Sequence, residues 1–378
     1  MPSDKTRVLA INPGSTSTKF GVYSRAGSEW TGEVRHSDAE LESFRGQSSL
    51  AQLEFRAAPM RTALDAAGFS IHDFAAVAGR GGLLPPMECG TYLVDNVMVE
   101  ELRLARRGEH ACNLGAVLAQ RFARDAGVNA YIVDPVTVDE WQDCARLSGL
   151  PSIPRSPIGH VLNTKAVAKR YAREQGLSYE SLRLVVVHLG SGITVSAHRD
   201  GRLIDNNTPD EGPFGPDRTG WLPVRALARL SASGTYNEKQ LERMLFGEGG
   251  LFAYLGTRDL REVERRIDSG DELAAAVVDA MLYQIAKEAG GMAAALQGLV
   301  DAVLLTGGMA HSARVIAYLR KHLEWIAPIA VYPGEDELLA LAQGVFRVLD
   351  GEEQPKRLPV EAAQRRKVRE PLKIGLEY

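Results

Sequence analysis

Two distant stretches of the chain share one pattern, an apolar strand, a glycine turn and an alternating strand, and this repeat limits the fold more than any other feature. The first stretch is TRVLAINPGSTSTKFGVY, which turns at Gly14 and Ser15. The second begins at Leu182, reads LRLVVVHLGSGITVSAHRDG, and turns at Gly190 and Ser191. Each half also contains an apolar run that ends in glycines, FAAVAGRGG and VDAVLLTGG. The sequence therefore predicts a duplicated domain.

Helical patterns lie between these strands. They are ACNLGAVLAQRFARDAG, HVLNTKAVAKRYAREQG and DELAAAVVDAMLYQIAKEAGG. In the last of them Leu273, Val277, Met281 and Ile285 recur four residues apart, which predicts one buried face. Strands that alternate with such helices indicate an α/β fold.

The length of 378 residues suggests about two domains. We expect a first domain at 1–134, completed by a C-terminal helix at 337–350, and a second at 135–336. Residues 351–378 are rich in charge and poor in aromatics, which predicts a loosely ordered extension. A nucleic-acid patch is the weaker interpretation of its cations, which are Lys356, Arg357, Arg365, Arg366 and Lys367.

The composition is that of a soluble globular protein, with 45% hydrophobic and 24% charged residues. A net charge of -4 argues against a general nucleic-acid binder. The first ten residues hold no apolar stretch of signal-peptide length, and no run is long enough to span a bilayer, so we expect a cytoplasmic protein without a membrane partner. Cys89, Cys112 and Cys144 form no C-x-x-C pair and are expected to be buried free thiols.

The stretch NPGSTSTK, from Asn12 to Lys19, places four hydroxyls, a glycine and a lysine between two strands. A hairpin needs only a turn, so Gly14 would satisfy its geometry. Hydroxyl donors beside a cation are instead suited to the oxygens of a phosphate. A Ser/Thr-rich surface turn is the alternative.

Six segments in this order resemble the acetokinase family, and within it the butyrate kinase branch more than acetate kinase itself. They are INPGSTSTKFGVY, GEHACNLGA, YIVDPVTVDE, HLGSGITVSA, DEGPFGPDRTG and LLTGGMAHS, and the resemblance runs from about residue 7 to 350. It implies the duplicated fold of the acetate and sugar kinase, heat-shock protein 70 and actin superfamily, with a nucleotide cleft between ribonuclease H-like halves. It also implies transfer of a phosphoryl group between ATP and a short-chain carboxylate, with magnesium, to give an acyl phosphate and ADP. A homodimer or higher homo-oligomer is implied as well.

The resemblance assigns the ligand positions motif by motif. Phosphate oxygens would be met by Ser15, Ser17 and Lys19 in the first half. The nucleotide phosphates would be met by His188, Gly190, Ser191 and Gly192, and the purine and ribose by Gly307 and Gly308. Magnesium would lie near Asn12 and an acidic residue of GEDELLALA, either Asp336 or Glu337. Acids also favour the first turn of a helix regardless of function.

The catalytic positions implied by the resemblance are Arg80, His110, Asp134, His160 and Arg218. Phosphoryl transfer spreads negative charge over oxygens, so fixed cations such as Arg80 and Arg218 suit it, and Arg80 would also meet the carboxylate. His110 and His160 would donate hydrogen bonds to the phosphoryl group. Asp134 is not expected to act as a general base, because the substrate acid, with a pKa of about 4.3, is already ionised near neutral pH and has no proton to lose. It would instead orient magnesium-bound water or an arginine. Its alternative is a strand-ending turn residue before Pro135.

The acyl pocket is expected to be roomy. Gly82 lies where acetate kinases have a bulky residue, Gly159 lies where the family usually has Phe, and Pro209 retains one apolar wall of the family site. Each buried methylene is worth about 0.8 kcal/mol, so extra room would favour acids longer than acetate, including branched ones. The alternatives are an acetate or propionate kinase and, from a different class, an actin-like nucleotide switch with no small-acid substrate.

Overall fold

The computed structural model describes residues 6–359, which form two compact units. The first unit contains the described residues up to Asp139, Leu150–Ser152 and those from Asp336 onward. The second contains Glu140–Gly149 and Ile153–Glu335. These boundaries lie a few residues from the predicted ones, 134/135 and 336/337.

The first unit is built on a sheet with the strand order β3-β2-β1-β4-β6-β5. Its strands are β1 (Arg7–Pro13), β2 (Ser17–Ser24), β3 (Gly27–Arg35), β4 (Phe74–Arg80), β5 (Thr91–Leu93) and β6 (Asn129–Val133). β1, β2 and β3 form an antiparallel meander, while β4 and β6 run parallel to β1. The polar stretch NPGSTSTK therefore spans the end of β1, the turn at residues 14–16 and the start of β2.

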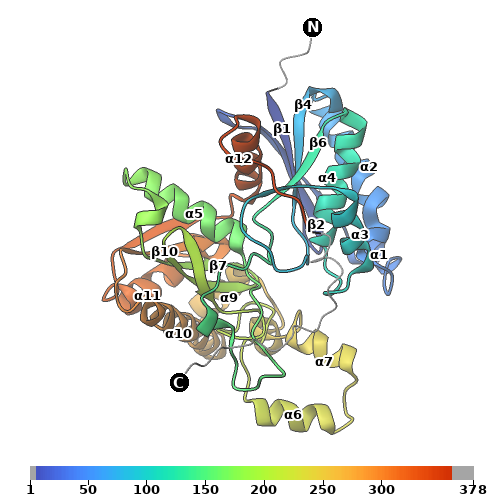
Figure 1. The fold of residues 1–378 in the computed structure, drawn as a ribbon. Helices are drawn as coiled ribbons and strands as arrows, with labels where there is room; N and C mark the ends of the chain where they lie inside the picture. Colours follow the sequence, from blue (N-terminus) through green and yellow to red (C-terminus); the bar gives the residue numbers. More distant parts are fainter. Residues whose placement is uncertain (1–5, 360–378) are drawn as a thin grey trace. The chain divides into compact units, whose positions relative to one another are not determined.

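Helices cover both faces of this sheet (Figure 1). α4 (Asn113–Ala126) packs on one face, with α2 (Leu53–Ala66) and α3 (Asn96–Leu104) beside it, and α12 (Glu337–Leu349) packs on the other. α4 lies very close to β4, because a Cβ added at Gly79 would lie 2.1 Å from the Gly115 carbonyl oxygen. The two glycines thus allow α4 to lie directly against the end of β4, where Arg80 is found.

The second unit repeats this plan. Its sheet has the order β11-β10-β7-β8-β9, in which β7 and β8 form a hairpin and β10 runs parallel to β7. The strands are β7 (Leu184–Leu189), β8 (Ile193–Arg199), β9 (Arg202–Asn206), β10 (Ala302–Gly307) and β11 (Ile329–Pro333). Read from β9, this is the order of the first five strands of the other sheet, so the predicted duplication is confirmed.

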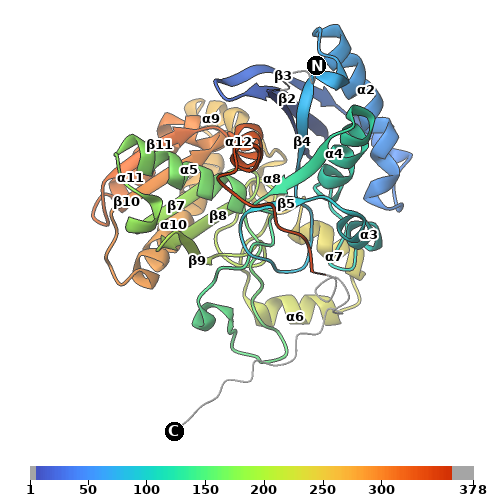
Figure 2. The ribbon, with the colours of Figure 1, turned by 45° about the horizontal axis from the view of Figure 1, so that its top comes forward.

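Helices lie on both sides of the second sheet (Figure 2), and the alternating side chains of β7 belong to two hydrophobic layers. Leu184 and Val186 pack against α5 (Val161–Glu174). Val185 and Val187 lie in the core formed with α10 (Glu272–Ala295) and α11 (Ala313–Leu323). A strand buried on both faces reads as a continuous apolar run, which is what the sequence VVV shows here.

One residue that was predicted to lie on the buried face of α10 is exposed, so that part of the prediction is wrong. Val277, Met281 and Ile285 are buried, but Leu273 is 55% exposed. Residues four apart on a helix drift by about 40° at each step, so Leu273 lies about 120° around the helix from Ile285. The buried face instead continues through Ala274 and Val278.

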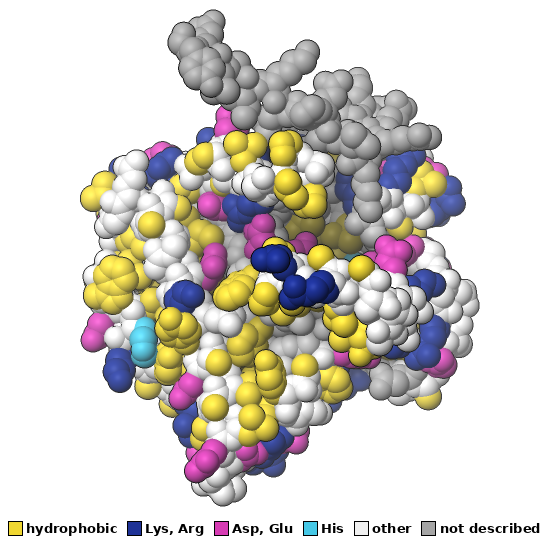
Figure 3. All heavy atoms as spheres, turned by 90° about the horizontal axis from the view of Figure 1, so that it is seen from below, with side chains coloured by type: hydrophobic (Ala, Val, Ile, Leu, Met, Phe, Trp, Pro, Cys, Tyr) yellow, Lys and Arg dark blue, Asp and Glu magenta, His cyan; other side chains and the backbone are white. Residues whose placement is uncertain are grey.

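The remaining helices are short. They are α1 (Asp38–Glu42), α6 (Val224–Ala232), α7 (Glu238–Leu245), α8 (Gly250–Leu255) and α9 (Leu260–Asp268), with 3-10 turns at Ser49–Gln52, Ile71–Asp73, Asp143–Arg146, Tyr179–Ser181 and Gly308–His311. Within residues 6–359, no helix is both long and apolar enough to cross a membrane. On the face in Figure 3, the described acidic, basic and hydrophobic side chains are interspersed rather than sorted by charge.

Two further predictions need correction. Of the three thiols, Cys112 is buried, but Cys89 is partly exposed and Cys144 is exposed. The beginning of the C-terminal extension is ordered, because Lys356 pairs through its backbone with Thr91 and Leu93 of β5 and through its ammonium with Glu88, at 2.7 Å. Arg357 lies 3.4 Å from Asp95, while Arg365, Arg366 and Lys367 lie outside the described residues.

Candidate active site

The loop after β1 presents polar groups at its tip. Ser15 is exposed and Ser17 is partly buried at the start of β2. Lys19, also exposed, pairs in register with Glu33 of β3. A hydrogen bond from the Ser17 hydroxyl is the main factor that lowers the pKa of Glu33. Ser17 and Lys19, two residues apart, therefore share one face of the strand beside an ionised carboxylate.

Glu337 lies at the start of α12, where its carboxylate meets Asn12 and Arg80. The Asn12 side-chain amide and the Arg80 guanidinium both donate to Glu337 Oε2. Glu337 is only 2% exposed, and its other oxygen, Oε1, is buried without a hydrogen-bond partner among the described residues. The neighbouring Asp336 is exposed. Of the two acids between which the sequence could not choose, Glu337 is therefore the one that the fold brings to Asn12.

The His110 ring is held by Cys112. The Cys112 N–H donates to His110 Nδ1 at 3.2 Å, and the Cys112 sulfur lies 2.9 Å from the same nitrogen. Because Nδ1 accepts, the proton of a neutral ring is on Nε2, which can donate to a ligand oxygen. Burial raises the pKa of the Cys112 thiol to about 11, so this sulfur stays protonated near neutral pH.

Gly82 lies in a tight place. A Cβ at this position would lie 2.6 Å from Asn113 Oδ1, 2.7 Å from Asn113 Cα and 2.8 Å from a methyl group of Leu102. The Asn113 side chain itself accepts a hydrogen bond from Leu83 N–H at 2.8 Å and donates to the Gly108 carbonyl at 3.1 Å. The expectation that the missing side chain leaves room for a substrate is wrong at Gly82, because Asn113 and Leu102 fill that room.

Asp134 directly follows β6 and has a left-handed backbone, with a φ of 39°. Its Oδ1 accepts the Gly90 N–H at 2.7 Å, and its own N–H donates to the Gly90 carbonyl at 3.1 Å. This reciprocal pair is the contact expected of a strand-ending turn residue. A catalytic role for Asp134 stays a prediction.

In the second unit, two histidines stack beside the glycine turn. The rings of His160 and His188 lie 4.0 Å apart and nearly parallel, at 16°. Thr194 Oγ1 lies 2.8 Å from His160 Nδ1, and Asn163 Oδ1 lies 3.0 Å from His188 Nδ1. His188 is fully buried, and its Nε2 has no hydrogen-bond partner among the described residues, although Glu335 Oε1 is 3.4 Å away. Both ring orientations are thus fixed by buried side chains.

Close contacts explain the glycines of the HLGSG turn. A Cβ at Gly190 would lie 2.7 Å from His188 Nε2, and a Cβ at Gly192 would lie 2.7 Å from Arg218 Nη1 and 3.2 Å from the His160 ring. Ser191, between them, is exposed. The second unit therefore brings Gly190, Gly192, His160, His188 and Arg218 to one place, as the resemblance implies.

The Arg218 guanidinium has a weak counter-charge. Its one ion pair within residues 6–359 is with Asp217, whose carboxylate lies 4.0 Å from Arg218 Nε. Burial is the main factor that raises the pKa of Asp217, and the positive charge of Arg218 opposes this. A cation with so distant a partner can interact strongly with an anionic ligand.

Gly159 is also enclosed. A Cβ there would lie 2.9 Å from the Asn206 amide nitrogen and 3.2 Å from the Thr194 methyl group. Side-chain atoms of Asn206 and Thr194 therefore lie close to Gly159, and the predicted gain in pocket volume stays a prediction here. Pro209 is partly exposed in the loop that follows Asn207, whose side chain fastens this loop to β8 through the backbone of Ile193 and Val195.

Gly307 is the last residue of β10, and Gly308 begins the 3-10 turn that follows. Gly307 has a φ of 94° and exchanges two 3.0 Å backbone hydrogen bonds with Gly334. Its Cβ would lie 2.5 Å from the Leu189 carbonyl oxygen, so only glycine fits. Around Gly308 an added Cβ would meet nothing within 4 Å, which leaves its backbone accessible.

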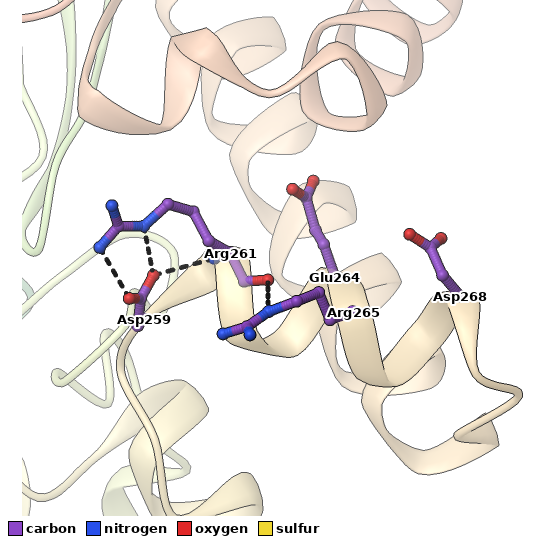
Figure 4. Close-up of a pocket in the computed structure, with 5 residues that line it drawn as sticks. All are labelled: Asp259, Arg261, Glu264, Arg265 and Asp268. Atoms are coloured by element: carbon purple, nitrogen blue, oxygen red, sulfur yellow. Dashed lines mark hydrogen bonds and ion pairs between the residues drawn. The ribbon is translucent and has the colours of Figure 1, made fainter.

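No group of three or more His, Cys, Asp or Glu side chains within the described residues could hold a metal ion by itself. A hollow on α9 is lined by Asp259, Arg261, Glu264, Arg265 and Asp268 (Figure 4). The lining carboxylates and guanidinium groups largely pair with one another or with neighbouring helices, as between Arg314 and Asp268 at 2.7 Å. The hollow contains none of the predicted site residues.

Comparison with known proteins decides the family. Residues 159–331 match the family model described as "Acetokinase family". The chain is 46% identical over 352 residues to a "Probable butyrate kinase" of Clostridium botulinum, an alignment that covers 93% of this chain and 99% of the relative. It is also 46% identical over 355 residues to "Butyrate kinase 2" of Clostridium acetobutylicum, again with 93% and 99% coverage. The chain belongs to the acetokinase family.

Solved structures support the fold of this acetokinase family member. The crystal structure of Porphyromonas gingivalis acetate kinase superposes with a TM-score of 0.76 at 19% identity, over 91% of this chain and 100% of that one. A propionate kinase from Francisella tularensis superposes with a TM-score of 0.72 at 17% identity, over 90% and 98% of the two chains. The predicted fold class, the duplicated two-domain α/β fold found in acetate kinases, is confirmed.

Several side chains that position the site were not predicted from the sequence. They are Arg56, Cys112, Asn113, Asn163, Thr194 and Glu335. Thr194 follows the glycine turn by two residues, and the period of a strand would have placed it on the same face as Gly192. Arg56 lies 42 residues from Gly14, and nothing local in the sequence connects the two.

Proposed function

We propose that this acetokinase family member is a butyrate kinase. In this reaction a carboxylate oxygen of butanoate attacks the γ-phosphorus of ATP, the bond to the β,γ-bridging oxygen breaks, and butanoyl phosphate and ADP are formed, reversibly. The proposal rests chiefly on the identity of 45–46% with chains named butyrate kinase, along 93% of this chain. The contacts within each unit support it.

In the first unit, the proposed roles are divided between the loop after β1 and the end of β4. The hydroxyls of Ser15 and Ser17 and the Lys19 ammonium would donate to phosphate oxygens. Arg80 would neutralise negative charge on the substrate carboxylate and the phosphoryl group, while Glu337 holds its guanidinium in place. The Nε2 proton of His110 would stabilise the same phosphoryl oxygens.

The environment of Glu337 fits a magnesium ion. Glu337 Oε1 is a buried carboxylate oxygen with no donor among the described residues, and Asn12 adjoins the same carboxylate. Mg²⁺ in proteins is commonly held by one or two carboxylates together with waters and substrate phosphates, which agrees with the absence of a larger ligand group within residues 6–359. The ion would neutralise charge on the ATP phosphates.

In the second unit, the glycine turn after β7 would hold the nucleotide phosphates. Gly190 and Gly192 let the backbone approach closely, and the exposed Ser191 adds a hydroxyl. His160 and Arg218 converge at Gly192, so both would act on the transferring group, with His188 stacked behind His160. The backbone of Gly308 is open to a nucleoside, next to Gly307.

No general base is required in this mechanism. The substrate carboxylate is already ionised near neutral pH, so catalysis depends on position and on positive charge. Asp134 would then act only through the backbone of Gly90, which its side chain and N–H fasten.

The acid can be identified by trapping acyl phosphate with hydroxylamine. Purified protein, Mg²⁺ and ATP would be assayed with straight and branched acids of two to six carbons. We expect the highest kcat/KM at butanoate or at a branched acid of similar length. A maximum at acetate or propionate would change the assigned substrate and keep the carboxylate kinase, whereas no trapped product with any acid would contradict the proposed function.

A cytoplasmic location and a homodimer or larger homo-oligomer are also proposed. The proposed assembly rests on the family resemblance. Sedimentation analysis would test the assembly.

A further inference from the structure

Arg56 is a buried cation next to residues 14–17 of the first unit, the loop to which we assign phosphate binding. It lies in the first turn of α2 and is 1% exposed. Its Nη1 donates to the Gly14 carbonyl at 2.8 Å and to the Ser17 carbonyl at 3.2 Å. Its Nη2 donates to the Ser15 carbonyl at 3.1 Å. One guanidinium thus holds three carbonyls of a four-residue loop.

Two side chains complete the environment of Arg56. Gln52, one turn earlier, accepts from both Nε and Nη2 at 2.9 and 2.8 Å. Thr18 Oγ1 accepts from Nη1 at 3.0 Å and also lies 3.1 Å from His36 Nε2. The Nε, Nη1 and Nη2 groups of the guanidinium therefore all donate hydrogen bonds, and only a guanidinium offers donors in this planar geometry.

These contacts sort the loop into an acceptor side and a donor side. The fourth carbonyl, of Thr16, accepts the His36 N–H at 2.8 Å, so all four carbonyls of residues 14–17 point to protein donors. Within residues 6–359, the N–H groups of Ser15 and Thr16 have no protein acceptor, and the side chains of both residues are exposed. The accessible side of the loop therefore consists of donors, which suits an oxyanion.

The charge of Arg56 is not balanced by an acid. Among the residues that the structure describes, Arg56 has no carboxylate partner, and all its acceptors are neutral. Burial lowers the pKa of Arg56 to about 10, so the guanidinium remains charged near neutral pH. A buried cation without a counter-ion is costly unless it serves an anion nearby.

We propose that Arg56 is a positioning residue for phosphoryl transfer. It pulls the carbonyls of Gly14, Ser15 and Ser17 away from the ligand, so that the hydroxyl and N–H donors face the phosphate, and it adds a positive charge behind them. Arg56 does not touch the substrate itself. This inference rests on the proposed kinase function.

A purely structural role would predict a different result. If Arg56 only satisfied carbonyls for folding, its replacement would lower the melting temperature and leave the turnover of the folded enzyme unchanged. If it positions the loop, the folded variant loses turnover, while ADP binding persists because the nucleotide is assigned to the second unit.

The test compares three variants with the wild-type enzyme. Arg56→Lys keeps the charge and loses the fork, whereas Gln52→Met keeps Arg56 and removes its side-chain anchor. Arg61→Lys, on the same helix, is the matched control, because Arg61 pairs with Asp125 and has no contact with the loop. Each is assayed for kcat of acyl phosphate formation, for ADP affinity by calorimetry, and for the melting temperature.

We expect kcat to fall about 100-fold in Arg56→Lys, since a displacement of about 1 Å in a catalytic group can have such an effect. Gln52→Met should lose about tenfold, and Arg61→Lys should stay within twofold. ADP affinity should stay within twofold in all three.

Other outcomes would overturn the inference. These are a kcat within threefold of wild type in both Arg56→Lys and Gln52→Met, an equal loss in Arg61→Lys, or a parallel loss of ADP affinity and turnover. A wild-type enzyme that forms no acyl phosphate would contradict the proposed function first, and the inference with it.

Discussion

The two oxygens of the Glu337 carboxylate have different surroundings. Oε2 accepts from Asn12 and Arg80, while Oε1 is buried without a donor among the described residues. A buried acceptor in this state is costly, and its position next to Asn12 suits the magnesium ion proposed above. A side chain that holds both the proposed magnesium ion and Arg80 would be sensitive to neutralisation.

We predict that Glu337→Gln lowers kcat by a factor of about 100 to 1,000, because the amide neither attracts Mg²⁺ nor balances Arg80. The free Mg²⁺ concentration for half-maximal activity should rise about 10- to 100-fold. Activity measured against free Mg²⁺ checks both effects, with Glu352→Gln as an exposed control. A larger rise in Asp336→Asn than in Glu337→Gln would show that the neighbouring acid faces the metal.

A substitution at Gly82 tests whether this glycine lines the acyl pocket. Gly82→Ala would bring a methyl group to 2.7 Å from the backbone of Asn113, where little can move. Overpacking of this kind typically costs about 1 to 3 kcal/mol. We expect a lower melting temperature and an unchanged order of preference among acids from two to six carbons. A shift of that preference toward acetate would mean that Gly82 does line the acyl site.

At the scale of elements, β8 carries a buried histidine that cannot easily take up a proton. Tyr179 OH lies 2.7 Å from His198 Nδ1, and Ser196 Oγ lies 2.8 Å from His198 Nε2 while it donates to the Val186 carbonyl. Nε2–H therefore donates to Ser196, and Nδ1 accepts from Tyr179. Burial, aided by the charge of Lys165, lowers the pKa of His198 to about 3.

This pKa predicts how stability depends on pH. In the unfolded chain His198 has a pKa of about 6.5, so below that pH only the unfolded state binds the proton. The stabilisation is complete above pH 6.5 and is lost as the pH falls toward 3, by up to about 1.4 kcal/mol per pH unit. Urea unfolding of the wild type and of His198→Gln between pH 7 and 4.5 measures this, with the exposed His72→Gln as control. The same pH slope in His198→Gln as in wild type would contradict the assignment.

The elements that the sequence predicts best are those with a strong local period. The hairpins β1-β2 and β7-β8, the strands that end in glycines, and the helix from residue 337 are found where predicted. The third strands of the two meanders, β3 and β9, were missed, since the polar and charged residues of GSEWTGEVR and RLIDN do not alternate clearly. Leu273 shows that a four-residue spacing overestimates a buried face that spans more than two turns.

At the scale of the whole molecule, the duplication explains which site residues could be predicted. Each half places a glycine turn between its first two strands and a glycine at the end of the parallel strand beside them, so motif positions locate Ser15, Gly190 and Gly307 without a structure. What the sequence could not show is which distant side chains hold these turns. Arg56, Asn163 and Asn113 come from helices, and their contacts depend on tertiary packing rather than on local pattern.

The volume of the acyl pocket also required tertiary information. A glycine in place of a larger residue indicates missing volume only if nothing else fills it. Asn113 and Leu102 occupy the volume beside Gly82, and side-chain atoms of Asn206 and Thr194 lie close to Gly159. The preference for butanoate in the proposed function therefore rests on the relatives and not on these two positions.

Phosphorus NMR of the reaction mixture tests the central claim most directly. Wild-type enzyme, Arg218→Ala and the exposed control Arg225→Ala would each be incubated with ATP, Mg²⁺ and butanoate. We predict an acyl phosphate resonance that requires butanoate and grows with ADP in the wild type and in Arg225→Ala, and a rate at least 100-fold lower in Arg218→Ala. ATP bound without any carboxylate-dependent phosphoryl transfer, or equal rates in Arg218→Ala and wild type, would contradict the account.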